Sequence, residues 1–356
     1  MRLAIGVFVV AVLIGWFARG QWDHASAAAS SAPGISRGGV AKQSLPPDTV
    51  LSVGPGRAVA QAPRQTKLSA MRQDVNAGRN LGPIYARLAS ANPRTPEETW
   101  LMARLLSMCG RIAPDAPQQG STSFKPPSAQ ESRSRFIDSL AADEPDRDRR
   151  IAAYDAMALD RTRCDELKDV QIARADWRRL LQDAAAAGEI KAQLDLAKEE
   201  IYDQYRAQTK TGKGGLATVT EAQIETARRA IASGDPYGIA EGVNLLTGGY
   251  ANMSLRDARD QPVDLRAFQA AGNLLACDAG YACGGQSGDL LQGCALFDRC
   301  GADNLRDYTM YYSASPYRSQ LIAQYEQALR GAMATNDWSA FRFHPGAASL
   351  PGAWLD

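Results

Sequence analysis

The amino-acid sequence predicts an all-α fold: antiparallel helical hairpins in an irregular, partly solenoid-like stack, with a disulfide-stapled C-terminal segment. From about residue 80 onward, apolar residues recur at spacings of three and four, which is the period of an amphipathic helix. No stretch alternates apolar and polar residues for long enough to predict a sheet. Six cysteines, four of them between positions 277 and 300, supply the cross-links.

The N-terminus is predicted to be an export segment. Arg2 precedes an uncharged apolar run from Leu3 to Phe17, which fits a signal peptide and is short for a helix that spans about 30 Å of hydrocarbon. Ala25-Ser26-Ala27 offers a cleavage site, whereas its distance from the apolar run and the flanking aromatic residues favour an uncleaved anchor. We therefore expect residues 1–20 to be a membrane anchor or signal peptide, and the protein to be periplasmic, tethered to the inner membrane or released after cleavage.

Residues 21–76 have the composition of a flexible tether. Ala, Ser, Pro, Gly and Gln dominate this tract, so it buries too little apolar area to offset the entropy of ordering the chain. Gly34-Ile35-Ser36-Arg37-Gly38 matches the G-x-S-x-G string of hydrolase nucleophile elbows, but no strand precedes it and no helix follows. The helical domain is expected over residues 77–356.

Helix start and stop signals place the helices of this domain in order. Thr95-Pro96-Glu97-Glu98 predicts a start, with Thr95 as N-cap and Glu98 placed to complete a capping box. Gly188 and Gly234 each separate two helices, because glycine adopts the positive φ of a helix C-terminus without strain. Ser315-Pro316 opens the last long helix. The expected apolar faces comprise Leu101, Leu105 and Met108; Trp177, Leu180, Leu181 and Ala184; Ile190, Leu194, Ala197, Ile201 and Tyr205; Ile224, Ala227 and Ile231; Ile239, Val243 and Leu246; and Tyr317, Leu321, Tyr325 and Leu329.

The six cysteines follow an export segment, so we expect disulfides and no free thiols. Cys277, Cys283, Cys294 and Cys300 have the spacing C-x5-C-x10-C-x5-C, which favours pairing among themselves in an order that the sequence leaves open. Cys109 then pairs with Cys164. The alternative for the last four is a zinc site, but structural zinc sites usually place two to four residues between paired ligands.

Two helix junctions resemble a known repeat. The stretch Leu181–Ala197 around Gly188 is similar to the helix-turn-helix unit of Sel-like repeats, which belong to the tetratricopeptide class, and the turn at Gly234 echoes it. With the positions of the cysteines, we expect the helical domain to have three parts: residues 77–170 with the first disulfide, 171–264 with the Sel-like hairpins, and 265–356 with the other cysteines.

The wider layout resembles a group of uncharacterised exported helical proteins of Gram-negative bacteria. The residues that carry this resemblance are Leu105–Cys109, Arg163-Cys164, Ala186–Gly188 and Leu275–Cys283. No activity is assigned to that group, so the resemblance implies an architecture, with an N-terminal anchor, a tether and a helical domain, and implies no chemistry.

Composition and motifs exclude several function classes. With 40 Lys+Arg against 39 Asp+Glu, the chain lacks the basic field that nucleic-acid binding needs. Of two histidines, His24 lies beside the export segment and His344 in a C-terminal tail that Trp338 and Phe341 are expected to pack onto the last helix. Histidine metal centres and most histidine-based catalysis are therefore disfavoured. The segment Lys210–Gly215 lacks the residues of a phosphate-binding loop. We predict no cofactor and no metal.

A recognition surface is expected in the C-terminal segment, where polar and aromatic residues lie among glycines and disulfides. Its candidate residues are Asp278, Tyr281, Gln286, Asp289, Tyr311 and Tyr312. The same segment would also cap the open end of a helical stack. The predicted function is that of an interaction or scaffold module which binds a protein or peptide in the cell envelope without catalysis, contacts the membrane only through its N-terminus, and has an oligomeric state that the sequence leaves open.

The alternative function is an envelope hydrolase that uses an Asp/Glu pair. Adjacent acids such as Asp143-Glu144, Asp165-Glu166 and Glu199-Glu200 are numerous. General acid catalysis needs one carboxyl group in an apolar setting opposite another, and spacing along the chain does not reveal such convergence.

Overall fold

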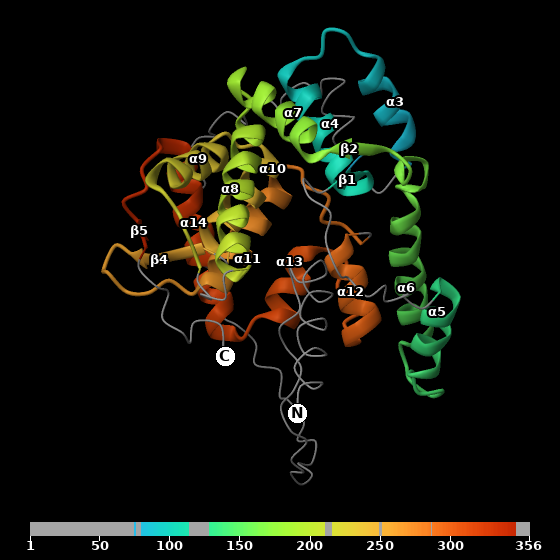
Figure 1. The fold of residues 1–356 in the computed structure, drawn as a ribbon. Coiled ribbons are helices and arrows are strands. Elements are labelled where there is room, and N and C mark those ends of the chain that lie inside the picture. The colour runs from blue at the N-terminus through green and yellow to red at the C-terminus, as the bar shows by residue number, and fades with distance from the viewer. Residues whose placement is uncertain are drawn as a thin grey trace, which may run out of the picture. The chain divides into compact units, whose positions relative to one another are not determined.

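The structure is a computed structural model that describes residues 75, 80–113, 128–210, 216–248, 251–285 and 287–346. The predicted membrane anchor, the nucleophile-elbow string and nearly all of the predicted tether lie outside these residues. The prediction of a mostly helical chain is confirmed (Figure 1). No helix in the described ranges is both long and apolar enough to cross a membrane.

Short loops connect most of the helices, and strands are few. The helices are α3 (Gly82–Ser90), α4 (Pro96–Cys109), α5 (Ala129–Asp138), α6 (Arg147–Thr162), the 3-10 turn η1 (Asp165–Leu167), α7 (Arg174–Ala186), α8 (Ile190–Lys210), α9 (Glu221–Ala232), α10 (Pro236–Thr247), α11 (Leu265–Asp278), α12 (Gly288–Phe297), α13 (Leu305–Asp307), the π-helical turn η2 (Tyr308–Ser313) and α14 (Pro316–Thr335). The strands are β1 (Arg111–Ala113), β2 (Gln171–Ala173), β3 (Ala217–Thr218), β4 (Ala251–Asp257) and β5 (Phe341–Pro345).

Local signals set the helix ends where the sequence predicts them. Thr95 caps α4 in a complete capping box with Glu98, and the Ser315 side chain accepts a hydrogen bond from the backbone N–H of Arg318 at the start of α14. Gly188 (φ +93°) and Gly234 (φ +70°) lie in the turns α7–α8 and α9–α10, so both turns use the backbone conformation that glycine adopts without strain.

The expectation of no sheet is wrong in detail, because two small sheets are present. β1 pairs in parallel with β2, while β4 lies between β3, to which it is parallel, and β5, to which it is antiparallel. The tail expected to dock on the last helix forms strand β5, in which Phe341 and Phe343 are buried and His344 is exposed. Phe341 also packs on that helix as expected, since its ring centroid lies 6.1 Å from that of Tyr325 in α14. Five alternating residues are too few to stand out in a helical sequence.

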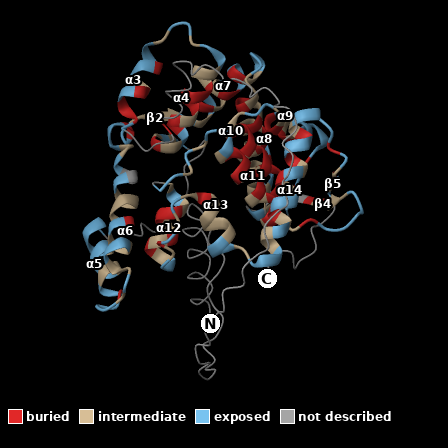
Figure 2. Cartoon of the chain, turned by 180° about the vertical axis from the view of Figure 1, so that it is seen from behind, coloured by how far each residue is buried: buried red, intermediate tan, exposed pale blue. Residues whose placement is uncertain are grey.

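Buried side chains form two main cores (Figure 2). The larger lies among α8, α9, α10, α11, α14 and strands β4 and β5, with Phe268 fully buried at its centre. The smaller joins α3, α4, α7 and the first turns of α8 and α10. Helices α10 and α11 approach closely, since a Cβ at Gly272 would lie 2.5 Å from Val243 Cγ2. In contrast, α5 has no buried residue.

All six cysteines are disulfide-bonded, which confirms the prediction of disulfides. The pairs are Cys109–Cys164, Cys277–Cys283 and Cys294–Cys300. The zinc alternative is therefore wrong, because these sulfurs are consumed in S–S bonds. Disulfides persist in oxidising compartments, which places the described domain outside the cytoplasm.

Helix α6 connects the first disulfide to the last. It ends two residues before Cys164, and along its first turn it lies beside α12 (Figure 1). Arg149 donates to the backbone carbonyl of Cys300, and Arg150 Nε donates to the carbonyl of Ala295 at 2.9 Å. The N-terminal and C-terminal parts of the domain are thus joined through this helix.

Candidate functional site

Exposed aromatic side chains concentrate in one stretch of the chain. Six large apolar side chains are exposed in the part that the structure describes, and four of them fall between residues 297 and 317: Phe297 (42% exposed), Tyr311 (79%), Tyr312 (40%) and Tyr317 (69%). Single exposed apolar residues are ordinary on soluble proteins, whereas a cluster marks an interaction site. We call Phe297, Arg299, Tyr308, Tyr311, Tyr312 and Tyr317 the aromatic surface.

The backbone of this surface is built from the end of α12, the turn η2 and the start of α14. Asp298 takes a left-handed conformation (φ 55°) that ends α12, and the Cys294–Cys300 disulfide ties the following loop back to the helix. The wider π-helical turn stacks the rings of Tyr308 and Tyr312, whose centroids are 6.4 Å apart with an interplanar angle of 19°. Short π-helical turns of this kind are frequent at functional sites.

Close packing against two glycines holds the rings of Tyr308 and Tyr312 in place. A Cβ at Gly293 would lie 2.3 Å from Tyr308 Cε2, so glycine is what admits this ring against α12. The Tyr312 hydroxyl lies against Gly301 in the same way. The Arg299 guanidinium carbon lies 5.7 Å from the centroid of the Phe297 ring and 5.9 Å from that of Tyr308. The side chains of Tyr308, Tyr312 and Arg299 are therefore held in place before any partner binds.

The structure separates the predicted recognition residues. Tyr311 and Tyr312 lie on the aromatic surface, and Gln286 lies outside the described residues. Asp278 is engaged in ion pairs with Arg306 and Arg330, which also pair with Glu326 of α14. Tyr281 and Asp289 belong to the surroundings of a charged network described below.

Sequence reasoning missed four members of the aromatic surface: Phe297, Arg299, Tyr308 and Tyr317. Tyr317 was expected on the apolar face of the last helix, but it is largely exposed because it lies in the first turn of α14, beside η2. Ser319 Oγ donates to the carbonyl of Met310 at 3.2 Å, which holds that first turn against η2. The density of tyrosines between positions 308 and 317 was the available signal.

A network of charged and polar side chains, which we call the polar network, lies where α4, α8 and α10 meet. The Asp195 carboxylate accepts hydrogen bonds from Trp100 Nε1 at 2.9 Å and from the Tyr237 hydroxyl at 2.7 Å. The Arg104 guanidinium lies over the Tyr237 ring, 4.9 Å from its centroid. Lys198 pairs with Glu241, whose side chain is 14% exposed.

Charge within this network sets the pKa of Glu241. Burial alone would raise the pKa of this carboxyl, but the Lys198 ammonium and the Arg104 guanidinium outweigh burial and lower it to about 2. Burial likewise raises the pKa of the Tyr281 hydroxyl, and the nearby Glu241 carboxylate adds to that rise. The network is thus ionised on both sides at neutral pH.

We expect Glu241 to make stability depend on pH below its ordinary pKa of 4.5. Because the folded-state pKa is depressed, the stabilisation is complete above 4.5 and is lost as pH falls through about 2, by on the order of 3 kcal/mol. Urea denaturation at several pH values should show that Glu241→Gln flattens this part of the profile. The matched variant Glu225→Gln, at a side chain that is 54% exposed, should leave the profile of the native protein unchanged; equal effects of the two variants would contradict the assignment.

A second carboxylate pair lies on the α7–α8 hairpin. Burial raises the pKa of Glu199, and the negative charge of Asp203 adds to the rise while Arg174 opposes it. The pKa of Asp203 is lowered, since hydrogen bonds from Arg206 and Arg178 outweigh its burial. Both carboxylates bind the same Nη2 atom of Arg174, at 2.9 and 2.6 Å. Pairing with guanidinium groups is the arrangement of a structural ion-pair network.

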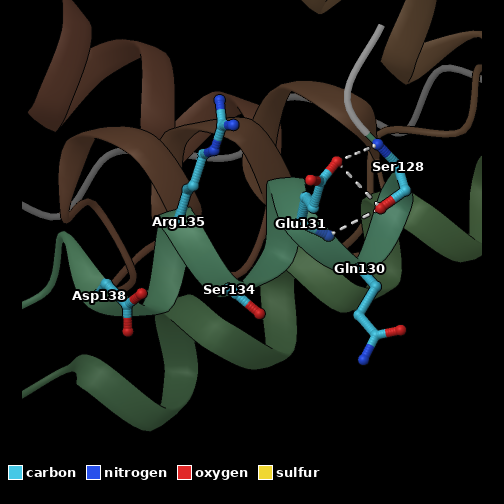
Figure 3. Close-up of a pocket in the computed structure, with 6 residues that line it drawn as sticks. All are labelled: Ser128, Gln130, Glu131, Ser134, Arg135 and Asp138. Atoms are coloured by element: carbon cyan, nitrogen blue, oxygen red, sulfur yellow. Dashed lines mark hydrogen bonds between the residues drawn. The ribbon is translucent and has the colours of Figure 1, made fainter.

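A shallow hollow on α5 is lined by residues of one helix and its N-cap: Ser128, Gln130, Glu131, Ser134, Arg135 and Asp138 (Figure 3). The hydrogen bonds inside it, between Ser128 and Glu131, form the capping box of α5. The Ser128 and Glu131 side chains that line the hollow therefore cap the N-terminus of α5. No cluster of metal-ligating side chains occurs within the described ranges.

Comparisons with known proteins leave the chain without an assigned relative: no protein-family model matches it, and neither curated proteins nor solved structures yielded a match.

Proposed function

We propose that this chain is an exported helical interaction module that binds a protein partner in the periplasm through the aromatic surface, without chemistry of its own. The observation that carries the proposal is the concentration of exposed aromatic side chains at 297–317 on a backbone that a disulfide and close glycine contacts hold in place. Tyrosine and arginine dominate the residues that contribute most to protein–protein binding.

Preorganisation supports binding by this surface. The rings of Tyr308 and Tyr312 are already stacked, so little side-chain entropy remains to be lost when a partner covers them. A tyrosine ring offers a large apolar area together with a hydroxyl group for hydrogen bonding, which suits a surface that must be stable both in water and in a complex. The N-terminal segment would hold the module at the inner membrane, and the tether would let it reach its partner.

The experiment that tests the proposal is site-specific photocrosslinking in cells that express the full-length chain. A photoreactive phenylalanine analogue at Tyr311 should form a discrete crosslinked product, and the same analogue at Leu159, which is 68% exposed on α6, should form none with that partner. Equal crosslinking from both positions would contradict the proposal.

Alanine variants then measure the contribution of the surface. With the crosslinked partner purified, Tyr311→Ala and Tyr312→Ala should each weaken binding by about tenfold or more, as expected for aromatic residues central to an interface. Leu159→Ala, at another exposed apolar position, should leave the dissociation constant unchanged. Unchanged affinity in both tyrosine variants would show that the partner binds elsewhere.

A hydrolase acting through an Asp/Glu pair receives less support. Burial raises the pKa of Glu199, but this carboxyl group is bound to the Arg174 guanidinium, which opposes the rise and occupies it.

A further inference from the structure

Arg299 of the aromatic surface has no carboxylate partner, unlike other arginines in the C-terminal part of the domain. Arg306 pairs with Glu326 at 2.9 Å, and Arg318 pairs with Asp264 at 3.0 Å. Among the residues that the structure describes, no carboxylate lies within ion-pair distance of Arg299, whose side-chain contacts are aromatic rings and hydroxyl groups. The aromatic surface therefore carries a positive charge that the protein itself does not neutralise.

The Arg299 guanidinium is held at a defined place. The backbone N–H of Arg299 donates to the carbonyl of Gly293 at 3.1 Å, and the next residue, Cys300, is in a disulfide. The rings of Phe297 and Tyr308 both lie within the range of cation–π attraction from the guanidinium carbon. A charge that is positioned in this way loses little side-chain entropy when a partner binds it.

Two hydroxyl groups lie beside one nitrogen of this guanidinium. Arg299 Nη1 is 3.5 Å from the Tyr308 hydroxyl oxygen and 3.4 Å from Ser313 Oγ, distances at the long limit of hydrogen bonding. A hydroxyl group that accepts from a guanidinium keeps its own proton to donate. Within the described ranges neither hydroxyl donates to a protein acceptor, so N–H and O–H donors gather here around a positive charge.

These donors select the chemistry of the group that they bind. A set of donors with a positive charge suits an anion, and a carboxylate matches the planar guanidinium with two oxygens. The exposed rings of Tyr311 and Tyr312 belong to the same surface and offer apolar area. A small free anion would use the donors alone, whereas a peptide with a carboxylate between apolar side chains would use the donors and the rings together.

We propose that the partner of the aromatic surface presents an aspartate or glutamate side chain whose carboxylate binds Arg299 together with the hydroxyl groups of Tyr308 and Ser313. Apolar side chains on either side of that carboxylate cover the exposed tyrosine rings. The inference rests on the proposed function, to which it adds the chemistry of the segment that docks: acidic at its centre and apolar around it.

The test is an NMR titration of the full-length chain labelled with ¹⁵N-arginine, in which the side-chain Nε–Hε signals are observed. The probes are two blocked tripeptides, acetyl-Leu-Asp-Leu-amide and acetyl-Leu-Asn-Leu-amide, which differ only in a carboxylate and an amide of the same shape. The Arg299 signal, assigned by its loss in Arg299→Lys, should shift in a saturable way at about tenfold lower concentration of the aspartate peptide. The signal of Arg306, which is already paired with Glu326, is the internal control and should not shift.

Three variants, followed through the ring signals of ¹³C-labelled tyrosine, make the test specific. Arg299→Gln should bind both peptides equally. Tyr308→Phe keeps the ring against Gly293 but removes one hydroxyl group, so the preference for the aspartate peptide should narrow to about threefold. The matched control Arg259→Gln, at an exposed arginine of another part of the fold, should keep the full preference. Circular dichroism checks that each variant is folded.

The outcomes separate this inference from the proposed function. Equal affinity of the native protein for the two peptides would overturn the inference, even where the analogue at Tyr311 yields a crosslinked partner. Inorganic phosphate at matched ionic strength is the free-anion arm, and a shift of the Arg299 signal at lower concentrations of phosphate than of the aspartate peptide would contradict it as well. A preference for the aspartate peptide without any crosslinked product would support the carboxylate site and count against the proposed function.

Discussion

Removing the Cys109–Cys164 disulfide should lower the free energy of unfolding by about 4 kcal/mol. This bridge joins residues 55 positions apart, at the end of α4 and just beyond α6, so its loss restores much conformational freedom to the unfolded chain. The change is the double variant Cys109→Ala with Cys164→Ala, which leaves no unpaired thiol. Equilibrium urea denaturation measures the difference.

The two short disulfides provide a matched comparison. Cys294 and Cys300 are six positions apart, so the same chain-entropy argument predicts a loss of about 2 kcal/mol in the free energy of unfolding for the double variant Cys294→Ala with Cys300→Ala. Peptide mapping of the native protein without reductant should recover all three pairs. If the long and the short bridge cost the same free energy when removed, loop closure is not the source of the stabilisation.

Phe268→Ala should destabilise the domain by about 3–5 kcal/mol. Phe268 is fully buried in the larger core, where its ring meets those of Phe341 and Tyr325 at centroid distances of 5.0 and 6.0 Å in edge-to-face geometry. Truncation leaves a cavity at the point where α11, α14 and β5 converge, and the surrounding elements have little room to collapse into it. Thermal and urea denaturation should both report the loss.

Phe297→Ala is the matched control for that prediction. Phe297 is 42% exposed and its ring contacts the Arg299 guanidinium, a contact worth about 0.5–1 kcal/mol at an exposed site, so its truncation should cost much less than that of Phe268. The same variant should weaken binding of a partner at the aromatic surface. Equal destabilisation by the two phenylalanine variants would contradict the assignment of Phe268 to the core.

Helices were predictable from this sequence because their signals are local. Thr95 and Glu98 are three positions apart, and Gly188 lies within the turn that it forms. The small sheets were not predictable, since β1 pairs with β2 and β4 with β5 across long stretches of chain, and such pairings leave no mark on either strand alone.

The candidate sites divide in the same way. Tyr311 and Tyr312 could be proposed from their place after the cysteine cluster, but Tyr317 fits a helical stripe and so was expected to be buried. The polar network was hidden altogether: Arg104, Lys198 and Glu241 come from three helices, and each looks like an ordinary helix-surface charge in the sequence. Only the packing of α4, α8 and α10 brings them together.

The Cys109–Cys164 disulfide, which encloses α6, determines how the protein responds to a single proteolytic cut. Because Cys109 and Cys164 are joined, a single backbone cut anywhere between them leaves two fragments that remain one covalent molecule. When the cut lies between Arg150 and Cys164, the contacts of Arg149 and Arg150 with the carbonyls of Cys300 and Ala295 also hold the first fragment on the second. On a denaturing gel, a nicked chain should therefore migrate as one band without reductant and as two bands with it. The nicked protein should keep its aromatic surface until the disulfides are reduced.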